Sequence, residues 1–223
     1  MPRFKLLAYV QLLRLPNIFT AVADPLAGWL IAGGGRASQF ALTIGASVGL
    51  YTAGIVFNDC FDYRRDCRDR PERPLPRGDI PVRVAWTIGT ILFLTGLVLG
   101  GVNALPLAAL IIFYNAFAKH FTWLGPATLG TCRACNLALG MGGFAMHWPP
   151  IIILGAYVTS LSVVARREDV RPELRRLVKY LLLGIIAVDA ALVLTITGDW
   201  TGAALVLSLL VPATMLGKII PMT

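Results

Sequence analysis

Charged residues are scarce in this chain, at 14% of its 223 residues, whereas hydrophobic residues make up 57%. A soluble domain usually carries about 25% charged residues. The apolar residues also form runs long enough to cross a bilayer, which argues against a soluble helical bundle. The composition therefore predicts an all-α, polytopic membrane protein. A cleavable signal sequence is not expected, because the basic segment Met1–Leu15 leads directly into the first long apolar run.

Cysteine and histidine are also few, with four and two residues respectively. Cys60 and Cys67 fall in a segment that we place in the reducing cytosol, where disulfides are rare. Cys132 and Cys135 form a C-x-x-C pair inside an apolar run, without a second pair or a neighbouring histidine in the sequence. This pattern favours neither a disulfide framework nor a thiolate metal site.

The apolar runs predict about eight membrane spans in one membrane domain that covers residues 1–223. Apart from Arg36 and Arg133, the 20 Lys and Arg residues fall in segments that would share one side of the membrane. The positive-inside rule places that side, with the N-terminus and the aspartate-rich loops, in the cytosol. The net charge of +8 then follows from topology and from contact with anionic membrane lipid, so a nucleic-acid partner is not expected. The predicted spans are Pro16–Ala32, Phe40–Phe57, Val84–Val102, Leu105–Ala118, Ala127–Met146, Pro149–Ala165, Leu177–Thr197 and Gly202–Leu216.

Only 12 residues are acidic, and half of them lie in residues 58–83, directly after the second predicted span. Asp59, Asp62 and Asp66 follow i, i+3, i+7 spacing, so on a helix their carboxylates share one face. Like charges held this close beside a membrane indicate a bound cation. With Asn58 they offer the oxygen ligands that Mg²⁺ prefers, and the arginines of the same loop can bind a diphosphate. The alternative is a solvated loop in which acids and arginines pair with one another.

A resemblance strengthens the first interpretation. Asn58-Asp59-x-x-Asp62-x-x-x-Asp66, followed by RPLPxG from Arg73, resembles the first signature of the UbiA superfamily of intramembrane prenyltransferases. Three other segments resemble that family in the expected order, so the similarity covers most of the chain. They are Leu13–Asn17 at the entry to the first helix, Tyr114–Lys119 at the end of the fourth, and Arg133–Gly140 in the fifth.

The resemblance implies an all-helical bundle around a cavity that opens to lipid and is capped by cytosolic loops. It also implies Mg²⁺ on the diphosphate of an isoprenyl donor, with Asn58, Asp59 and Asp62 as ligands and Asp66 in support. Asp59 and Asp62 would be catalytic through that metal. The substrate-binding residues expected on the same basis are Asn17, Arg73, Tyr114, Lys119, Arg133, Asn136, Arg166 and Arg167.

The chain departs from the family at its second acidic motif, which normally reads DxxxD after the sixth span. Here Ala165 takes the place of the leading aspartate, and Arg166 and Arg167 follow it. We expect Glu168 and Asp169 to serve as ligands of a second cation, or the two arginines to replace that cation as clamps on the diphosphate. This variant most resembles the EboC branch of UbiA-like proteins. The family also has nine spans, one more than we predict here.

Arg133 and Asn136 lie at i, i+3 inside an otherwise apolar span. An arginine at membrane depth is costly unless it faces a cavity or pairs with an acid. We favour contact with the substrate, and the alternative is a structural pairing with Asp24 or Asp189.

Together these patterns predict Mg²⁺-dependent transfer of an isoprenyl group from a polyprenyl diphosphate to an unknown acceptor within the membrane. The rival hypothesis is a non-catalytic isoprenoid-binding, lipid-binding or transport protein. It is motivated by Ala165 and by the missing ninth span.

Overall fold

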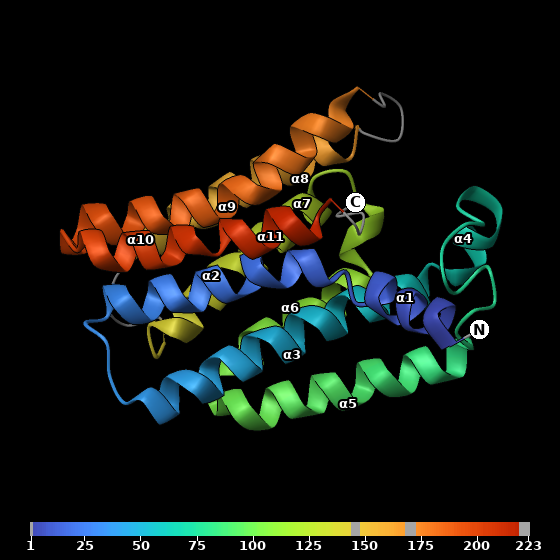
Figure 1. The fold of residues 1–223 in the computed structure, drawn as a ribbon, viewed down its shortest axis with the longest axis horizontal. Coiled ribbons are helices and arrows are strands. Elements are labelled where there is room, and N and C mark those ends of the chain that lie inside the picture. The colour runs from blue at the N-terminus through green and yellow to red at the C-terminus, as the bar shows by residue number, and fades with distance from the viewer. Residues whose placement is uncertain (1, 144–147, 168–172, 219–223) are drawn as a thin grey trace.

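The computed structural model describes residues 2–143, 148–167 and 173–218. Throughout these ranges the chain forms helices and turns, and no strand occurs. Most helices lie along one common direction (Figure 1), which confirms the expected all-α bundle. The helices are α1 (Pro2–Leu12), α2 (Leu15–Ile31), α3 (Ala37–Phe61), α4 (Tyr63–Asp69), α5 (Val82–Gly100), α6 (Leu105–Ala116), α7 (Leu124–Gly140), α8 (Trp148–Ala165), α9 (Leu174–Thr197), α10 (Trp200–Ser208) and α11 (Leu210–Leu216), with short 3-10 turns η1 (Gly101–Ala104) and η2 (Ala118–His120).

The eight predicted spans overlap these helices, but the count of eight spans is not confirmed. The predicted span Ala127–Met146 extends beyond α7, which ends at Gly140, and its residues 144–146 lie outside the described residues. The predicted span Gly202–Leu216 is divided between α10 and α11. Among the described helices, four apolar stretches are long enough to cross a membrane, and a fifth results if α1 and α2 count as one bent span. The helix α7 and the stretch Trp200–Leu216 have 17 residues each, short of the roughly 20 that a bilayer requires. The four stretches are Ala37–Phe61, Val82–Ala116, Trp148–Ala165 and Leu174–Thr197.

The stretch Val82–Ala116 reverses its direction. Gly89 on α5 packs against Phe57 near the end of α3, and Gly96 packs against Leu50 in the middle of α3. The two helices are therefore antiparallel. Gly101, with a φ of 57°, makes the turn into η1, and α6 then runs back along α3 toward the end of the bundle where α4 lies.

The chain also bends between α1 and α2, by 41°. Pro16 in the first turn of α2 has no N–H to donate, so the preceding helix cannot continue through it. Arg14, at the break, adopts the left-handed conformation with a φ of 43°. Non-glycine residues rarely adopt this conformation, and they do so mainly where the surrounding structure enforces it, often at functional sites.

Two apolar clusters hold the bundle together. One joins α2 with α7 to α11, and the other joins α3 and α6 with α7. The helices α2 and α7 approach very closely, because Gly28 and Gly140 leave no side chain between them: a Cβ added at Gly140 would lie 2.3 Å from the carbonyl oxygen of Pro25. A third, smaller cluster anchors α1 and the loop after α4 on the end of α3.

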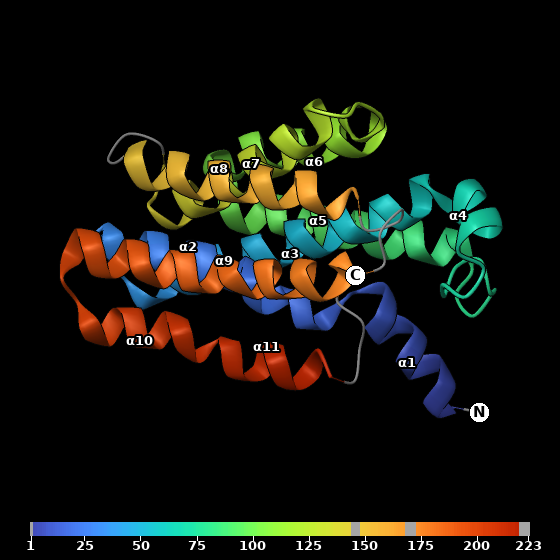
Figure 2. The ribbon, with the colours of Figure 1, turned by 90° about the horizontal axis from the view of Figure 1, so that it is seen from above.

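The loops that we predict on one side of the membrane gather at one end of the bundle. Figures 1 and 2 show α1, α4 and the start of α5 at that end, and the α2–α3 and α9–α10 links at the other. Successive links therefore lie at opposite ends of the bundle, as the predicted topology requires.

Candidate active site

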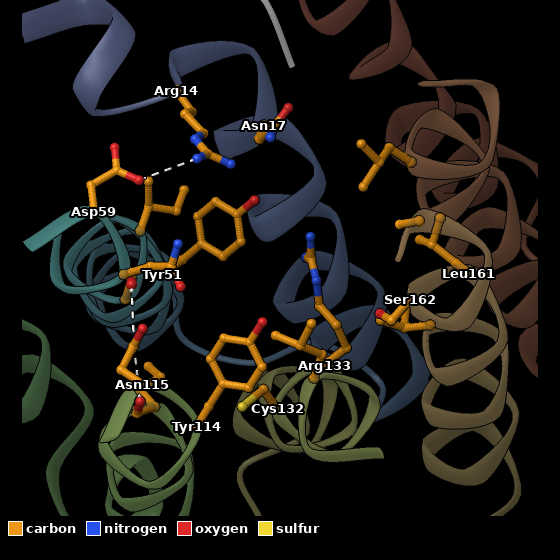
Figure 3. Close-up of a pocket in the computed structure, with 18 of the residues that line it drawn as sticks. Arg14, Asn17, Tyr51, Asp59, Tyr114, Asn115, Cys132, Arg133, Leu161 and Ser162 are labelled. Carbon is orange, nitrogen blue, oxygen red and sulfur yellow. Dashed lines mark hydrogen bonds and ion pairs between the residues drawn. The ribbon is translucent and has the colours of Figure 1, made fainter. Parts of the chain in front are cut away.

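A cavity of about 940 Å³ opens between the two main apolar clusters. It is lined by α2, α3 and α6 to α9 and by the loop after α4, and Figure 3 shows its polar part. Aliphatic side chains cover most of its depth, where Tyr51, Arg133 and Asn136 also line it, and charged side chains surround the end near α4, which we call the rim. The aliphatic lining residues include Ile55, Leu107, Ile111, Val158, Leu161 and Ile185.

The three aspartates predicted to share a helix face do lie on one buried side at this rim. Asp59, Asp62 and Asp66 are 5%, 7% and 1% exposed, while Arg64 and Arg65 between them are exposed. The helix is not continuous, because α3 ends at Phe61 and α4 begins at Tyr63. The interruption at Asp62 is mild: its N–H still bonds the carbonyl of Asn58, and its own carbonyl accepts from the N–H of Asp66.

Each of these carboxylates is paired with a cation. A single Nη of Arg73 lies 2.7 Å from Asp66 and 3.4 Å from Asp59, and Arg14 lies 3.3 Å from the same oxygen of Asp59. Asp62 is 2.9 Å from the Nζ of Lys119. It also lies 3.6 Å from a nitrogen of the exposed Arg65. The rim therefore holds its acids in a neutralised form.

The RPLPxG segment explains how Arg73 reaches the acids. Leu75 and, just beyond the segment, Ile80 are 2% and 1% exposed, and they anchor this loop in the third apolar cluster. Gly78 has a φ of 80°, a conformation that glycine adopts without strain, so the chain can turn between the two anchors. With the loop fixed in this way, the side chain of Arg73 extends over α3 and α4.

The oxygen atoms of Asn58 and the rim aspartates are of the kind that Mg²⁺ prefers as ligands, but the acidic side chains do not point toward one common position. Among the described residues, no three acidic, histidine or cysteine side chains are grouped closely enough to hold a metal ion. Two observations support the fit of the donors. Asn58 and Asp59 face the chamber, and the Oδ1 atom of Asp66 is buried without a hydrogen-bond partner. The rim thus presents oxygen atoms of the kind that Mg²⁺ prefers, held in ion pairs with arginine and lysine.

Most, but not all, of the other predicted site residues line the chamber. Asn17, Arg73, Tyr114, Arg133, Asn136 and Arg166 line the chamber. Lys119 lies just behind the lining, paired with Asp62. Arg167 is exposed and is not part of the lining, and Glu168 and Asp169 lie outside the described residues.

Arg133 faces the chamber and makes the structural pairing with Asp24 that was the alternative to contact with the substrate. It lies on the chamber wall and donates to Asp24 at 2.9 Å, and Asn136 donates to the same carboxylate oxygen at 2.8 Å. Its guanidinium also lies 5.0 Å from the centre of the Tyr51 ring, a cation–π distance. The pairing neutralises a charge that would otherwise be very costly in this position.

Sequence reasoning missed several lining residues, among them Arg14, Tyr51, Asn115 and Arg175. Tyr51 could have been found, because it precedes Asn58 by seven residues and so shares its helix face. Arg14 gave no such signal, since its position depends on the break between α1 and α2.

These features define a helical membrane protein with an apolar chamber whose mouth is rich in paired acids and bases. The sequence model of the UbiA prenyltransferase family matches residues 20–221, and the chain belongs to that family.

The curated relatives point within the family to one kind of protein. A digeranylgeranylglyceryl phosphate synthase from Saccharolobus solfataricus is 29% identical over 175 residues, which are 74% of this chain and 61% of that protein. The protein of the same name from Methanothermobacter thermautotrophicus is 32% identical over 168 residues, 71% of this chain and 58% of its own length. The chain thus spans about three fifths of the length of these relatives. They leave the suggested likeness to the EboC branch untested.

Solved structures share the fold. A structure described for digeranylgeranylglyceryl phosphate synthase in membranes superposes with a TM-score of 0.64 at 23% identity, covering 96% of this chain and 88% of its own. A UbiA homologue from Archaeoglobus fulgidus bound to GPP and Mg²⁺ gives a TM-score of 0.59 at 13% identity, covering 95% and 86%. At these identities the likeness establishes the fold and nothing about ligands of this chain.

Proposed function

We propose that this chain transfers an isoprenyl group from its diphosphate to a lipid acceptor inside the membrane, in a reaction that requires Mg²⁺. One observation carries the proposal: buried carboxylates and cations meet at the mouth of a chamber whose deeper walls are mainly aliphatic. A diphosphate at the rim would be bound by the charged groups, and its isoprenyl chain would lie along the aliphatic walls. The family membership and the Mg²⁺ and GPP bound to the Archaeoglobus fulgidus homologue support this proposal.

The ion-paired rim would be the state of the site before a substrate binds. Arg73 bridges Asp59 and Asp66 with one nitrogen, so these carboxylates become free as ligands only when Arg73 moves. A diphosphate gives Arg73, Arg14 and Lys119 stronger, doubly charged partners. Asn58, Asp59 and Asp62 would then hold the metal ion, with Asp66 in support. When bound, Mg²⁺ supplies neutralisation of the charge that develops on the departing diphosphate.

The chamber walls would protect the allylic carbocation that forms when the donor's C–O bond breaks. The bond between the first isoprenyl carbon and the diphosphate oxygen breaks, and both electrons leave with the diphosphate. An oxygen of the acceptor donates an electron pair to the allylic carbon, forms the new C–O bond and loses its proton. Aliphatic residues such as Leu107, Ile111 and Leu161 exclude the water that would otherwise capture the carbocation.

The names of the relatives suggest the acceptor. They are digeranylgeranylglyceryl phosphate synthases, whose product carries two geranylgeranyl groups on a glyceryl phosphate. We therefore take geranylgeranyl diphosphate as donor and the free hydroxyl of a singly substituted glyceryl phosphate lipid as acceptor. The N-terminus and the rim would face the cytosol, where the diphosphate is soluble.

The acids provide the direct test. Asp59→Asn or Asp62→Asn should lower transfer of a radiolabelled geranylgeranyl group by about 10²-fold or more, since each removes a charged ligand of the metal ion that would neutralise the leaving group. The matched control is Asp79→Asn, which changes an exposed acid of the same loop that pairs with Arg77. Full activity in both rim variants would rule out the metal assignment.

One observation favours the rival hypothesis of a lipid-binding or transport protein, namely that every rim aspartate is already paired with a cation. Such a protein would bind isoprenyl diphosphate and release no pyrophosphate. The release of pyrophosphate therefore separates the two functions.

A further inference from the structure

Two aspartates lie against each other in the interior of the bundle, behind the chamber wall. Asp24 in α2 and Asp189 in α9 are both 0% exposed, and neither belongs to the rim. Both fall in the middle of apolar helices that we expect to lie within the membrane. Acidic residues at this depth are costly, and where they occur they are paired or mark the site of an ion or a proton. The charge of this pair therefore has to be balanced.

The pair carries more negative charge than the side chains around it balance. Arg133 forms the one salt bridge that the described residues make with these two aspartates, and its Nη1 lies 2.9 Å from Oδ2 of Asp24. Asn136 donates to the same oxygen at 2.8 Å and adds no charge. With both carboxylates ionised, one negative charge is left over. A buried charge without a partner is strongly destabilising, so the group lacks one positive charge.

The same group also has more hydrogen-bond acceptors than donors. Four of its buried oxygen atoms receive no hydrogen bond from the described part of the chain, namely Oδ1 of Asp24, both carboxylate oxygens of Asp189, and Oδ1 of Asn136. A proton shared by the two carboxyl groups would balance the charge, but it would satisfy one oxygen of each and leave two acceptors without a partner. A small hard cation binds several oxygen atoms at once, so it meets both needs.

The orientation of the Asn136 amide is fixed by the helix α2. Pro25 has no N–H, so the carbonyl of Ala21, four residues earlier, loses its partner within the helix. That carbonyl accepts instead from Ser47 at 2.8 Å and from the amide nitrogen of Asn136 at 2.9 Å. The same nitrogen also donates to Asp24, so both of its hydrogens are used. A reversed amide would face two acceptors, and the Oδ1 of Asn136 therefore remains available as a ligand.

We propose that Asp24, Asp189 and Asn136 form a binding site for one small monovalent metal cation, for which Na⁺ is the probe. A monovalent ion supplies the single charge that the group lacks, whereas a divalent ion would leave a positive charge in its place. Asn136 lines the chamber together with Arg133 (Figure 3), so an ion can enter from that side. The bound ion would join α2 to α9 behind Arg133. This inference is independent of the transfer reaction and of the Mg²⁺ ligands at the rim.

A binding measurement tests the inference without turnover. The purified protein is placed in nanodiscs of uncharged phospholipid at fixed pH and ionic strength, with choline replacing sodium. Radioactive sodium should bind at about one ion per chain, and the unfolding temperature should rise with sodium and then saturate. Asp189→Asn removes the unbalanced charge, so this variant should stay folded and lose both effects. The control Asp79→Asn makes the same change at an exposed acid that pairs with Arg77, and it should keep both effects.

The wild-type protein and the variant each offer a result that would overturn the inference. Stability that is indifferent to sodium and rises as the pH falls would show that the two carboxyl groups share a proton instead. Saturable binding of sodium that persists in Asp189→Asn would place the ion elsewhere. Asp189→Ser, which is neutral, smaller and able to donate to Asp24, repeats the comparison if Asp189→Asn does not fold.

Discussion

At the scale of single residues, the most constrained group is the buried trio of Arg133, Asp24 and Asp189. Asp24 and Asp189 have no exposed surface, and Asp189 lies against Asp24. Neither oxygen of Asp189 receives a hydrogen bond from a donor, and one oxygen of Asp24 is also without one. An ionised carboxylate without donors is very costly in this environment. Arg133 and Asn136 both donate to one oxygen of Asp24, so Asp24 is the carboxylate that pairs directly with Arg133.

This pairing predicts unequal effects of two similar substitutions. Asp189→Asn should be tolerated, because Asp189 accepts no hydrogen bond and an amide at this position can donate to Asp24. Asp24→Asn should destabilise the protein by about 3–5 kcal/mol, because it leaves the charge of Arg133 buried and unpaired. Thermal unfolding of the two purified variants in detergent makes the comparison. Equal losses of stability would contradict this difference.

The aspartates of the rim, and their pairing with arginines of the same loop as one alternative, could be predicted from the sequence, but the pairing of Asp59 with Arg14 could not. The spacing of Asp59, Asp62 and Asp66 is local, so it indicated a shared face directly. The partner Arg14 is 45 positions away from Asp59 and reaches it only because α1 and α2 break at that residue. Such contacts depend on the tertiary fold, which local patterns do not contain.

At the scale of secondary-structure elements, the contact between α2 and α7 determines where Asp24 and Arg133 meet. Gly140→Ala should destabilise the protein by about 1–3 kcal/mol or prevent folding, because the new methyl group would overlap the backbone of Pro25. The matched control is Gly155→Ala on α8, where the nearest atom would be 3.4 Å away, an ordinary contact.

Melting temperatures and the yield of folded protein report this difference. If Gly140→Ala is as stable as the control, the close approach of the two helices is not needed. The sequence located α2 to within one residue at each end, since long apolar runs are a strong signal, but it extended the run of α7 to Met146, beyond the end of that helix at Gly140. Its count of about eight spans is not confirmed, because α2, α6 and α7 are short and depend on their neighbours for burial.

At the scale of the whole molecule, the distribution of basic residues predicts which end of the bundle faces the cytosol. We expect the rim to be cytosolic, since almost all Lys and Arg residues belong to segments at that end. Cys67 on α4 is exposed, so a membrane-impermeant maleimide can report on it. The background variant lacks the other three cysteines, which are buried or partly buried.

In intact cells Cys67 should stay unlabelled, and it should react once the membrane is permeabilised. A cysteine placed at Arg36, at the opposite end of the bundle, should show the reverse, with labelling in intact cells. Labelling of Cys67 from outside would invert the topology and with it the compartment that supplies the diphosphate.

The most direct test of the central claim is the release of pyrophosphate from geranylgeranyl diphosphate by the purified protein, measured with acceptor lipid in Mg²⁺ and again in EDTA. We predict release with Mg²⁺ that stops in EDTA and that is lost in Asp59→Asn. A protein that binds the diphosphate in both conditions and releases no pyrophosphate would contradict the account.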